Sequence, residues 1–165
     1  MFATKQRFGL GRVYLDATAE ARRRGDRRIG SDHIALALLA DPDSVTARAL
    51  GVDLAAARAA VQALDREALA AVGIQADCVE PVVTGWRNER LPLSPAAKAV
   101  FTGLRTRARG ESLGIQHVLL ALLDRPRPDP AAELLDALGV NRAEVRRRLR
   151  DCWCAMEGNP DARRP

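Results

Sequence analysis

The sequence predicts an all-α protein of two tandem four-helix repeats, which together form a pseudo-twofold bundle of eight helices. A motif of an aliphatic residue, glycine, two variable residues and histidine occurs at 29–33 and again at 113–117, each time followed by an apolar run ending in aspartate. A Leu-Gly-Val sequence follows each run, at 50–52 and 138–140. Apolar residues make up 47% of the chain and aromatic residues only 4%, a composition typical of helices.

The apolar run of the first copy is predicted to be a helix in the core. We expect Ser31 at its N-cap, where the hydroxyl accepts a hydrogen bond from an amide of the first turn. Asp32 then lies at the positive end of the helix dipole. Every residue from Ile34 to Ala40 is apolar, so no face of the helix suits water. Because a bilayer crossing needs about 20 apolar residues, the helix belongs in a protein core.

The second copy differs at the start of its core helix. Ile115 replaces Ser31 and Gln116 replaces Asp32, so both the hydroxyl and the charge are lost. His33 and His117, the two histidines of the chain, occupy equivalent positions. They are either ligands or bases in a site, or structural imidazoles bonded to the backbone in the turn before the core helix. The structural role is favoured because no carboxylate or thiol recurs near both.

The other helices of the first repeat (9–66) follow from spacing and from capping residues. The first helix begins near Leu10 and ends at Gly25, with an apolar stripe of Val13, Tyr14, Ala17 and Ala21. Its outer face carries the charged residues Arg12, Asp16, Glu20 and Arg22 to Arg24. A short helix capped by Asp43 or Ser44 ends at Gly51. A fourth helix starts after Asp53, with a stripe of Leu54, Ala57, Val61 and Leu64.

Residues 67–92 are predicted to link the repeats, and Trp86 within them either covers the seam between the repeats or contacts a partner. The second repeat (93–154) opens with Ser94 as N-cap and Pro95 at the first helical position. Its last two helices run from Ala131 to Leu138 and onward from Asn141, with a buried stripe of Val145, Leu149, Cys152 and Met156. Residues 1–8 and 155–165 are expected to be a loose arm and a frayed tail around this single domain.

The charge and the cysteine content limit which functions and which location we expect for this chain. The formal net charge is +5, and all but Lys5 and Lys98 of the 26 basic residues are arginine. Such a chain can bind nucleic acid or acidic proteins. A solvated surface is favoured, because the arginines lie on outer helix faces without interleaved aromatic residues. With three cysteines and no apolar leader segment near the start, we expect reduced thiols and a cytoplasmic protein that does not enter membranes.

The repeated motif resembles the Clp N-terminal (Clp repeat) domain, which precedes the ATPase modules of the ClpA and ClpC class of AAA+ unfoldases. The resemblance covers residues 10–152. It is clear at 29–34, Ile-Gly-Ser-Asp-His-Ile, where the family has Ile-Gly-Thr-Glu-His-Ile. It implies a substrate- and adaptor-docking module. No Gly-x-x-x-x-Gly-Lys-Ser/Thr motif occurs in the 165 residues, so the chain resembles a stand-alone copy without the ATPase modules, or a fragment of a longer protein.

In the ClpC branch, this resemblance also implies two pockets for phosphorylated arginine, each resting on the glutamate before the repeat's histidine. The first glutamate corresponds to Asp32 and the second to the neutral Gln116. The family's Thr-Pro-Arg at the start of the second repeat corresponds to Ser94, Pro95 and Ala96, without the basic residue. We therefore expect weak or absent phosphoarginine binding.

Taken together, these features predict a non-catalytic protein- or peptide-binding module of the Clp protease system: an adaptor, a substrate-docking domain or a ligand-sequestering domain. Its partners would be Clp ATPase or protease components, or their substrates and adaptors. The chain offers no nucleophile–base pair, metal-ligand set or carboxylate pair in register, so we expect no enzyme activity, cofactor or metal.

Two alternatives stay open. Some ClpC N-domains resemble receptors for cyclic peptide antibiotics, so the chain could sequester such a compound on an apolar surface near Phe8, Leu10, Val13 and Tyr14. The alternative interpretation of those residues, which is favoured, is packing between the repeats. The alternative from another class is an Arg-rich helical nucleic-acid-binding protein that uses Arg142 to Arg150 and Arg22 to Arg28.

Overall fold

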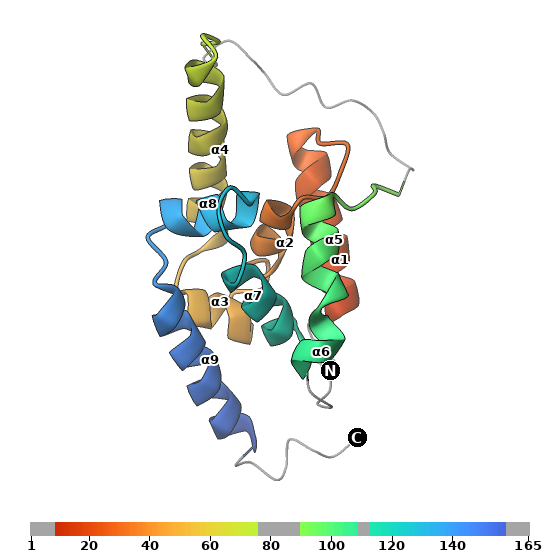
Figure 1. Ribbon diagram of the computed structural model, residues 1–165. Helices are drawn as coiled ribbons and strands as arrows, with labels where there is room; N and C mark the ends of the chain where they lie inside the picture. The colour runs from red at the N-terminus through yellow and green to blue at the C-terminus, as the bar shows by residue number, and fades with distance from the viewer. Residues whose placement is uncertain (1–8, 76–89, 109–112, 158–165) are drawn as a thin grey trace, which may run out of the picture.

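The computed structural model describes residues 9–75, 90–108 and 113–157, with the backbone alone for Arg105 and 153–157. Within these ranges the protein is all-helical, and its single β-bridge joins Ile29 to Leu93. The all-α prediction is therefore confirmed. The helices in chain order are α1 (Leu10–Arg24), α2 (Ser31–Ala37), α3 (Val45–Leu50), α4 (Leu54–Ala71), α5 (Pro95–Thr102), α6 (Leu104–Ala108), α7 (Ile115–Leu123), α8 (Pro130–Ala137) and α9 (Arg142–Glu157) (Figure 1).

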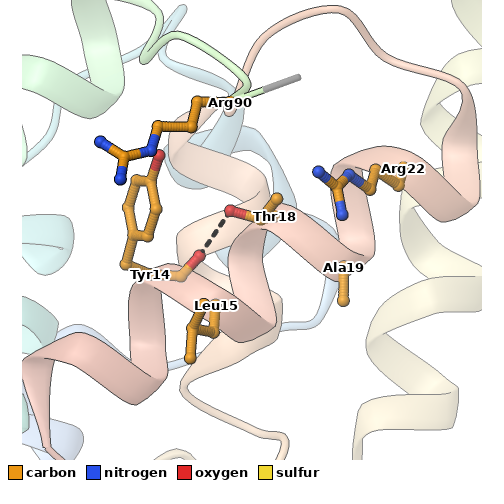
Figure 2. A pocket seen from close by; sticks show the side chains of 6 residues that line it. All are labelled: Tyr14, Leu15, Thr18, Ala19, Arg22 and Arg90. Atoms are coloured by element: carbon orange, nitrogen blue, oxygen red, sulfur yellow. Dashed lines mark hydrogen bonds between the residues drawn. The ribbon is translucent and has the colours of Figure 1, made fainter. Parts of the chain in front are cut away.

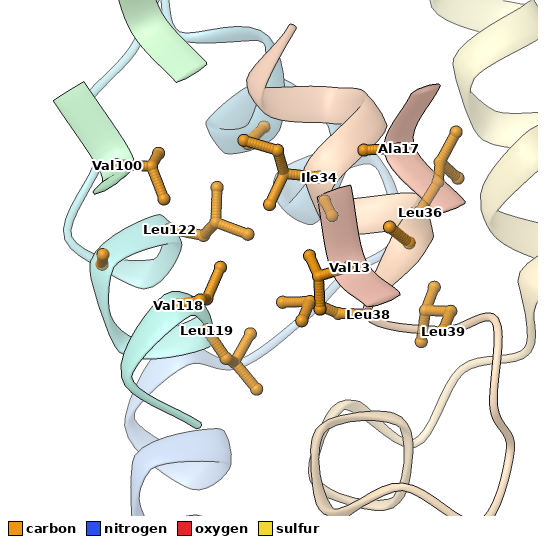
Figure 3. Close-up of a cluster of buried hydrophobic side chains, with 14 of the residues drawn as sticks. Val13, Ala17, Ile34, Leu36, Leu38, Leu39, Val100, Val118, Leu119 and Leu122 are labelled. Carbon is orange, nitrogen blue, oxygen red and sulfur yellow. The ribbon is translucent and has the colours of Figure 1, made fainter. Parts of the chain in front are cut away.

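Helix α2 lies at the centre of the molecule and packs against α1, α4, α5, α7 and α8. Every residue from Ser31 to Leu39 is buried. The helix ends at Ala37, earlier than predicted, and Leu38 and Leu39 continue the buried run in a turn, whereas Ala40 is exposed. Aliphatic side chains of α1, α2, α5 and α7 meet in one cluster (Figure 3). The predicted core helix is thus confirmed as the centre of the core.

Several contacts between helices occur twice, at equivalent places in the two halves of the chain. Helices α2, α3 and α4 of the first repeat correspond to α7, α8 and α9 of the second. The contact of α2 with α8 therefore corresponds to that of α7 with α3, and the contact of α4 with α8 corresponds to that of α9 with α3. Within each half, α1 packs on α2 as α5 and α6 pack on α7. These pairs support the predicted pseudo-twofold arrangement of two repeats. The expected eight helices become nine in the described ranges, because Gly103 divides the first helix of the second repeat into α5 and α6. Glycine is a weak helix former and disfavours a continuous helix there.

Most of the predicted helix ends are observed. Side-chain oxygens accept from backbone amides of the first turn at Ser44 (3.1 Å), Asp53 (2.7 Å), Ser94 (3.1 Å) and Asn141 (3.0 and 3.1 Å). The glycines of the two Leu-Gly-Val sequences, Gly51 and Gly139, have φ of 69° and 66°. This left-handed conformation favours glycine and lets the chain turn away from α3 and α8 at equivalent places.

Ser31 does not cap its own helix, so that prediction was wrong. Gly30 is the N-cap residue, and Ser31 is the first residue of α2. The Ser31 hydroxyl donates to Oδ1 of Asp129 at 2.6 Å and accepts from the backbone amide of Ala131 at 3.2 Å. Since Asp129 is the N-cap residue of α8, Ser31 completes the cap of a helix in the other repeat. These two hydrogen bonds of the Ser31 hydroxyl are buried, and they link the two halves of the bundle.

Three more expectations require correction. Glu20, expected on the outer face of α1, is buried and accepts hydrogen bonds from Arg58 of α4 and from Arg23. Helix α4 continues to Ala71, within the segment 67–92 expected to be a linker. Its second half extends away from the bundle and is largely exposed (Figure 1). Trp86 lies outside the described residues, and α9 continues to Glu157, past the start of the expected tail.

Replacing Ser31 by alanine should lower the free energy of unfolding by about 1–3 kcal/mol, because a buried carboxylate oxygen of Asp129 loses its hydroxyl donor. The matched change Thr102→Ala removes an exposed hydroxyl bonded to the carbonyl of Lys98. It should alter stability by no more than about 0.5 kcal/mol. Urea denaturation followed by circular dichroism measures both changes. Equal effects of the two substitutions would contradict a link between the repeats at Ser31.

Candidate functional site

Asp32, the carboxylate singled out from the sequence, is paired with an arginine of the same chain. Its Oδ2 accepts from Nη1 of Arg24 at 2.5 Å. Nη2 of Arg24 donates to both carboxylate oxygens of Asp65 on α4, at 3.2 and 2.9 Å, and its Nε lies 3.4 Å from Oδ2 of Asp26. Three carboxylates from three segments therefore surround one guanidinium, whose side chain is only 20% exposed. We call Arg24, Asp26, Asp32, Asp65 and the adjacent His33 the Arg24 cluster.

His33 completes this cluster as a hydrogen-bond donor. Its Nδ1 accepts from the backbone amide of Gly30 at 2.8 Å, which leaves Nε2 as the donor atom of the ring. Nε2 lies 2.9 Å from Oδ2 of Asp26 and donates to it. This hydrogen bond lowers the pKa of Asp26 below its ordinary value; burial opposes the shift and the charge of Arg24 reinforces it.

Arg24 remains firmly charged in this environment. Burial disfavours the charged guanidinium, but the nearby carboxylates of Asp32, Asp26 and Asp65 outweigh burial and raise the pKa of Arg24. Because Arg24 extends from the last turn of α1 toward α2 and α4, the cluster also fixes α1 against both helices. The geometry is that of a guanidinium-binding site whose occupant is part of the protein.

The second repeat uses its histidine in the same way. Nδ1 of His117 accepts from the backbone amide of Gly114 at 3.1 Å. Both histidines therefore bond to the amide that begins the core helix, which confirms the structural-imidazole interpretation. In the described part of the chain, no three or more His, Cys, Asp or Glu side chains are placed to hold a metal ion. Gln116 is half-buried, and the Ser94 hydroxyl caps α5.

The residues expected to form an apolar surface near the start of α1 lie in different environments. Val13 is fully buried in the core, and Leu10 packs partly buried against it, as the packing alternative requires. Tyr14 is half-buried, and its hydroxyl donates to the carbonyl of Leu91 at 3.4 Å. Phe8 lies outside the described residues. Of the predicted surface, Tyr14 is the residue that the structure places in a groove.

This groove runs along the outer face of α1, and we call it the α1 groove. Its volume is about 550 Å³, and it is lined by Tyr14, Leu15, Thr18, Ala19, Arg22 and Arg90 (Figure 2). The α1 residues follow the i, i+4 spacing of one helix face. Leu15 is 62% exposed, so the groove presents an uncovered aliphatic side chain. The sequence places Leu15 among the charged residues predicted to face outward, but it did not single this residue out.

The polar side chains of the α1 groove are a hydroxyl on the helix and two guanidinium groups. The Thr18 hydroxyl donates to the carbonyl of Tyr14 at 2.8 Å, so its proton is already used within the helix. The guanidinium groups of Arg22 and Arg90 lie at opposite ends, that of Arg90 beside the Tyr14 hydroxyl (Figure 2). The arrangement therefore offers an apolar floor with cationic groups at its ends.

A second, smaller groove of about 290 Å³ lies where the end of α2 meets α3 and the start of α4. Its lining residues are Leu39, Ala40, Pro42, Ala47, Gly51, Val52, Asp53 and Leu54. Its one carboxylate, that of Asp53, already accepts from the amide of Ala56 in the cap of α4. This groove thus offers apolar contact without a polar group that would orient a ligand.

Arginines of α9 are engaged within the protein. Arg142 donates to the carbonyl of Arg125 at 3.0 Å, and Arg146 pairs with Asp124 at 2.6 Å, both at the C-terminal end of α7. Arg147 and Arg148 pair with Glu144. Cations near a helix C-terminus stabilise its free carbonyls. These contacts give the arginines a structural role and reduce the cationic face that the nucleic-acid alternative requires.

Replacing Arg24 by alanine should destabilise the protein by about 1–3 kcal/mol, because three carboxylates then face one another without a cation. The effect should exceed that of Arg12→Ala, whose partner Asp16 forms an exposed helix pair. Guanidinium chloride at millimolar concentration should restore part of the melting temperature of Arg24→Ala, whereas sodium chloride should not. Calorimetry measures both. Failure of guanidinium to rescue would contradict a preformed guanidinium site.

The lowered pKa of Asp26 predicts the sign of its pH dependence. A depressed folded-state pKa adds stability that is fully present above the unfolded value of about 3.9 and is lost as the pH falls through the folded value. Asp26→Asn should therefore be less stable than the parent at pH 7, and the difference should shrink below about pH 4. Denaturation midpoints at several pH values measure this. A difference that grows on acidification would contradict the His33–Asp26 hydrogen bond.

Comparison with known proteins agrees with this fold and with its repeated motif. The family model of the Clp repeat (R) N-terminal domain matches residues 11–125, which are more than half of the chain. No curated protein matches the sequence. None of the helices in the described ranges combines the length and the apolar character that a bilayer crossing needs. The family is a non-catalytic domain that binds substrates and adaptors of the Clp system. The chain belongs to the Clp repeat N-terminal domain family.

Proposed function

We propose that this chain is a non-catalytic peptide- and protein-binding module of the Clp protease system, acting as an adaptor, a substrate-docking domain or a ligand-sequestering domain. The α1 groove carries this proposal. Binding sites for small ligands and peptide side chains are concave and mostly apolar, with a few polar groups that fix orientation. Leu15 and Ala19 supply apolar contact, and Arg22 and Arg90 supply polar groups at the ends. The partners would be cytoplasmic Clp components, their substrates or their adaptors.

The position of α1 supports this role. Its inner face is packed into the core, Glu20 pairs with Arg58 of α4, and Arg24 is held by Asp32 and Asp65. A helix fixed at so many points presents its outer face without reorganisation. Binding to a preorganised surface costs less free energy than binding to one that must first be ordered.

A cyclic peptide is a second candidate ligand of the same groove. The volume of about 550 Å³ lies within the roughly 300–1,000 Å³ typical of ligand sites. A ring closed before binding also loses less conformational entropy than a linear peptide. In this case the chain would sequester the compound instead of handing over a substrate.

We further propose that phosphoarginine binds weakly or not at all. Arg24 already occupies the carboxylate of Asp32, so a ligand guanidinium would have to displace an internal one. Gln116 brings no charge to the second position, and the hydroxyl of Ser94 is used in a helix cap. For nucleic acid, the internal ion pairs of α9 argue against a dedicated binding face.

The test is a peptide selected on the protein from a library of random 12-residue sequences, then titrated by fluorescence anisotropy. Leu15→Asp should weaken its binding by about tenfold or more, since burial of a leucine side chain contributes about 1.5–3 kcal/mol. Val72→Asp is the matched control, because Val72 is 71% exposed at the far end of α4. It should leave the affinity unchanged.

Free phosphoarginine added in excess should not displace the selected peptide. Equal losses in Leu15→Asp and Val72→Asp, or no loss in either, would contradict the assignment of binding to the α1 groove. Circular dichroism of both variants checks that the fold is intact.

A further inference from the structure

We infer that the α1 groove selects a peptide segment that carries an aliphatic side chain and, two residues away, one carboxylate. This inference rests on the proposed function and specifies its ligand. The aliphatic side chain lies over Leu15 and Ala19, and the carboxylate pairs with the guanidinium of Arg90. These three residues line the groove. Arg22 lines it too, but this preference requires no charge from Arg22.

Ala19 leaves room for a ligand side chain beside Leu15. The two residues lie one turn apart on one face of α1, and their side chains point to the same side of the helix (Figure 2). Both are exposed, Leu15 at 62%. Because Ala19 ends in a methyl group, a larger side chain can approach the helix there and pack against Leu15. An aliphatic side chain suits this place, since the contact removes apolar surface of both molecules from water.

Arg90 supplies a cation at the Tyr14 end of the groove. Its side chain is exposed, and its guanidinium lies beside the Tyr14 hydroxyl (Figure 2). That hydroxyl donates to the carbonyl of Leu91 at 3.4 Å, which holds the segment that carries Arg90 against α1. Within the described ranges, Arg90 has neither a hydrogen bond nor an ion pair. Its guanidinium is therefore available to a carboxylate, which it can bind through two parallel hydrogen bonds.

Acidic residues of α1 and of the turn after it are engaged by other groups of the protein. Asp16 accepts from Arg12 at 3.0 Å, one turn away on the same helix. Glu20 is buried and pairs with Arg58. Asp26 belongs to the Arg24 cluster. No carboxylate of the described residues lines the groove, so these groups do not take the place of a carboxylate of the ligand.

Arg28 adds positive charge close to the segment that carries Arg90. The amide of Ile29 donates to the carbonyl of Pro92, and the amide of Ser94 donates to the carbonyl of Ile29, each at 2.9 Å. This pairing holds the exposed Arg28 beside that segment. Arg28 also lacks an ion pair within the described part of the chain. An anionic side chain is thus attracted to this end of the groove, and a cationic one is repelled.

The length of α1 between the two contacts sets the spacing of the ligand. From Tyr14, which Arg90 adjoins, to Ala19, the helix advances by about 7.5 Å at about 1.5 Å per residue. Two residues of an extended peptide span about 6.6 Å, and their side chains point to the same side. A carboxylate two residues from an aliphatic side chain can therefore reach Arg90 while the aliphatic side chain covers Ala19. Either chain direction satisfies this spacing, so the patterns are Glu-x-Leu and Leu-x-Glu.

The test uses two sets of fluorescein-labelled peptides, Gly-Ser-Z-Ser-Leu-Ser-Gly and Gly-Ser-Leu-Ser-Z-Ser-Gly, in which Z is Glu, Gln or Lys. In at least one set, affinity should fall from Glu to Gln to Lys, by roughly three- to tenfold overall, as expected for exposed charge pairs. The set that shows the fall gives the direction of the bound chain. The fall should shrink at 0.5 M sodium chloride because salt screens exposed charges.

Three variants separate the two contacts from an effect of net charge. Arg90→Glu should bring the affinity ratio of the Glu peptide to the Lys peptide to one or below. Arg48→Glu on α3 makes the same change in net charge away from the groove and should leave this ratio unchanged. Ala19→Gln should weaken all peptides severalfold, because it puts a polar side chain in the room beside Leu15, and it should leave the ratio unchanged. Circular dichroism checks that the three variants are folded.

Each other outcome has a definite meaning. Equal binding of the Glu, Gln and Lys peptides in both sets, or failure of all of them while the library-selected peptide binds, overturns the acidic preference and leaves the proposed function standing. Failure of the library-selected peptide as well overturns both. A ratio lowered as much by Arg48→Glu as by Arg90→Glu assigns the effect to net charge and overturns the inference.

Two further results would also overturn it. Unchanged binding in Ala19→Gln would show that the aliphatic side chain does not lie over Ala19. A random-sequence oligonucleotide that displaces the Glu peptide, and binds with the same dependence on Arg90, would identify a surface for polyanions in place of a peptide site.

Discussion

Helix α2 has no polar face, and covering it on every side determines how the rest of the chain is arranged. Its residues from Ile34 onward bury aliphatic side chains toward α1, α5, α7 and α8, so that both halves of the chain share one core. One repeat alone would leave part of this helix exposed to water. The two halves are therefore needed together, and the buried hydrogen bond from Ser31 to Asp129 adds a directional link to an otherwise non-directional apolar contact.

A charge at the start of this buried helix imposes a second requirement. Asp32 is held near the core by the helix it begins, so its carboxylate needs a cation or a hydrogen-bond donor close by. Arg24 supplies the cation, and Asp26 and Asp65 share it. The second repeat has the neutral Gln116 at the equivalent position, where no such demand arises. The difference between the repeats is therefore electrostatic, and it places an internal arginine where the resemblance implied a ligand.

Much of the fold was predictable because the information is local. Gly25, Gly51, Ser94 and Asn141 end or begin helices through contacts within a few residues of themselves, and the apolar run at 34–40 is buried whatever covers it. The contacts of Ser31 with Asp129 and of Arg24 with Asp65 were not predictable, because these partners lie 98 and 41 residues away in the sequence. A single sequence offers no reason to choose those partners among many acidic residues.

The candidate site was predicted less well, for a related reason. The sequence drew attention to Val13, which the helical spacing of α1 directs into the core. It did not draw attention to Leu15, because one aliphatic residue on a polar face is common and has no local consequence. Arg90 belongs to the groove only through the tertiary position of residues 90–94. A groove between a helix and a distant segment is therefore visible in the structure alone.

The exposure of Leu15 is enforced by the rest of the molecule. Rotating α1 to bury this side chain would expose Val13 and Ala17, which are buried in the core. It would also break the pair between Glu20 and Arg58 and withdraw Arg24 from its three carboxylates. Burying a leucine completely gains about 1.5–3 kcal/mol, and exposing Val13 alone costs a similar amount. Because the loss of the ion pairs of Glu20 and Arg24 adds to that cost, the losses together exceed the gain. The apolar surface at Leu15 can thus be covered by another molecule, but not by a rearrangement of α1 itself.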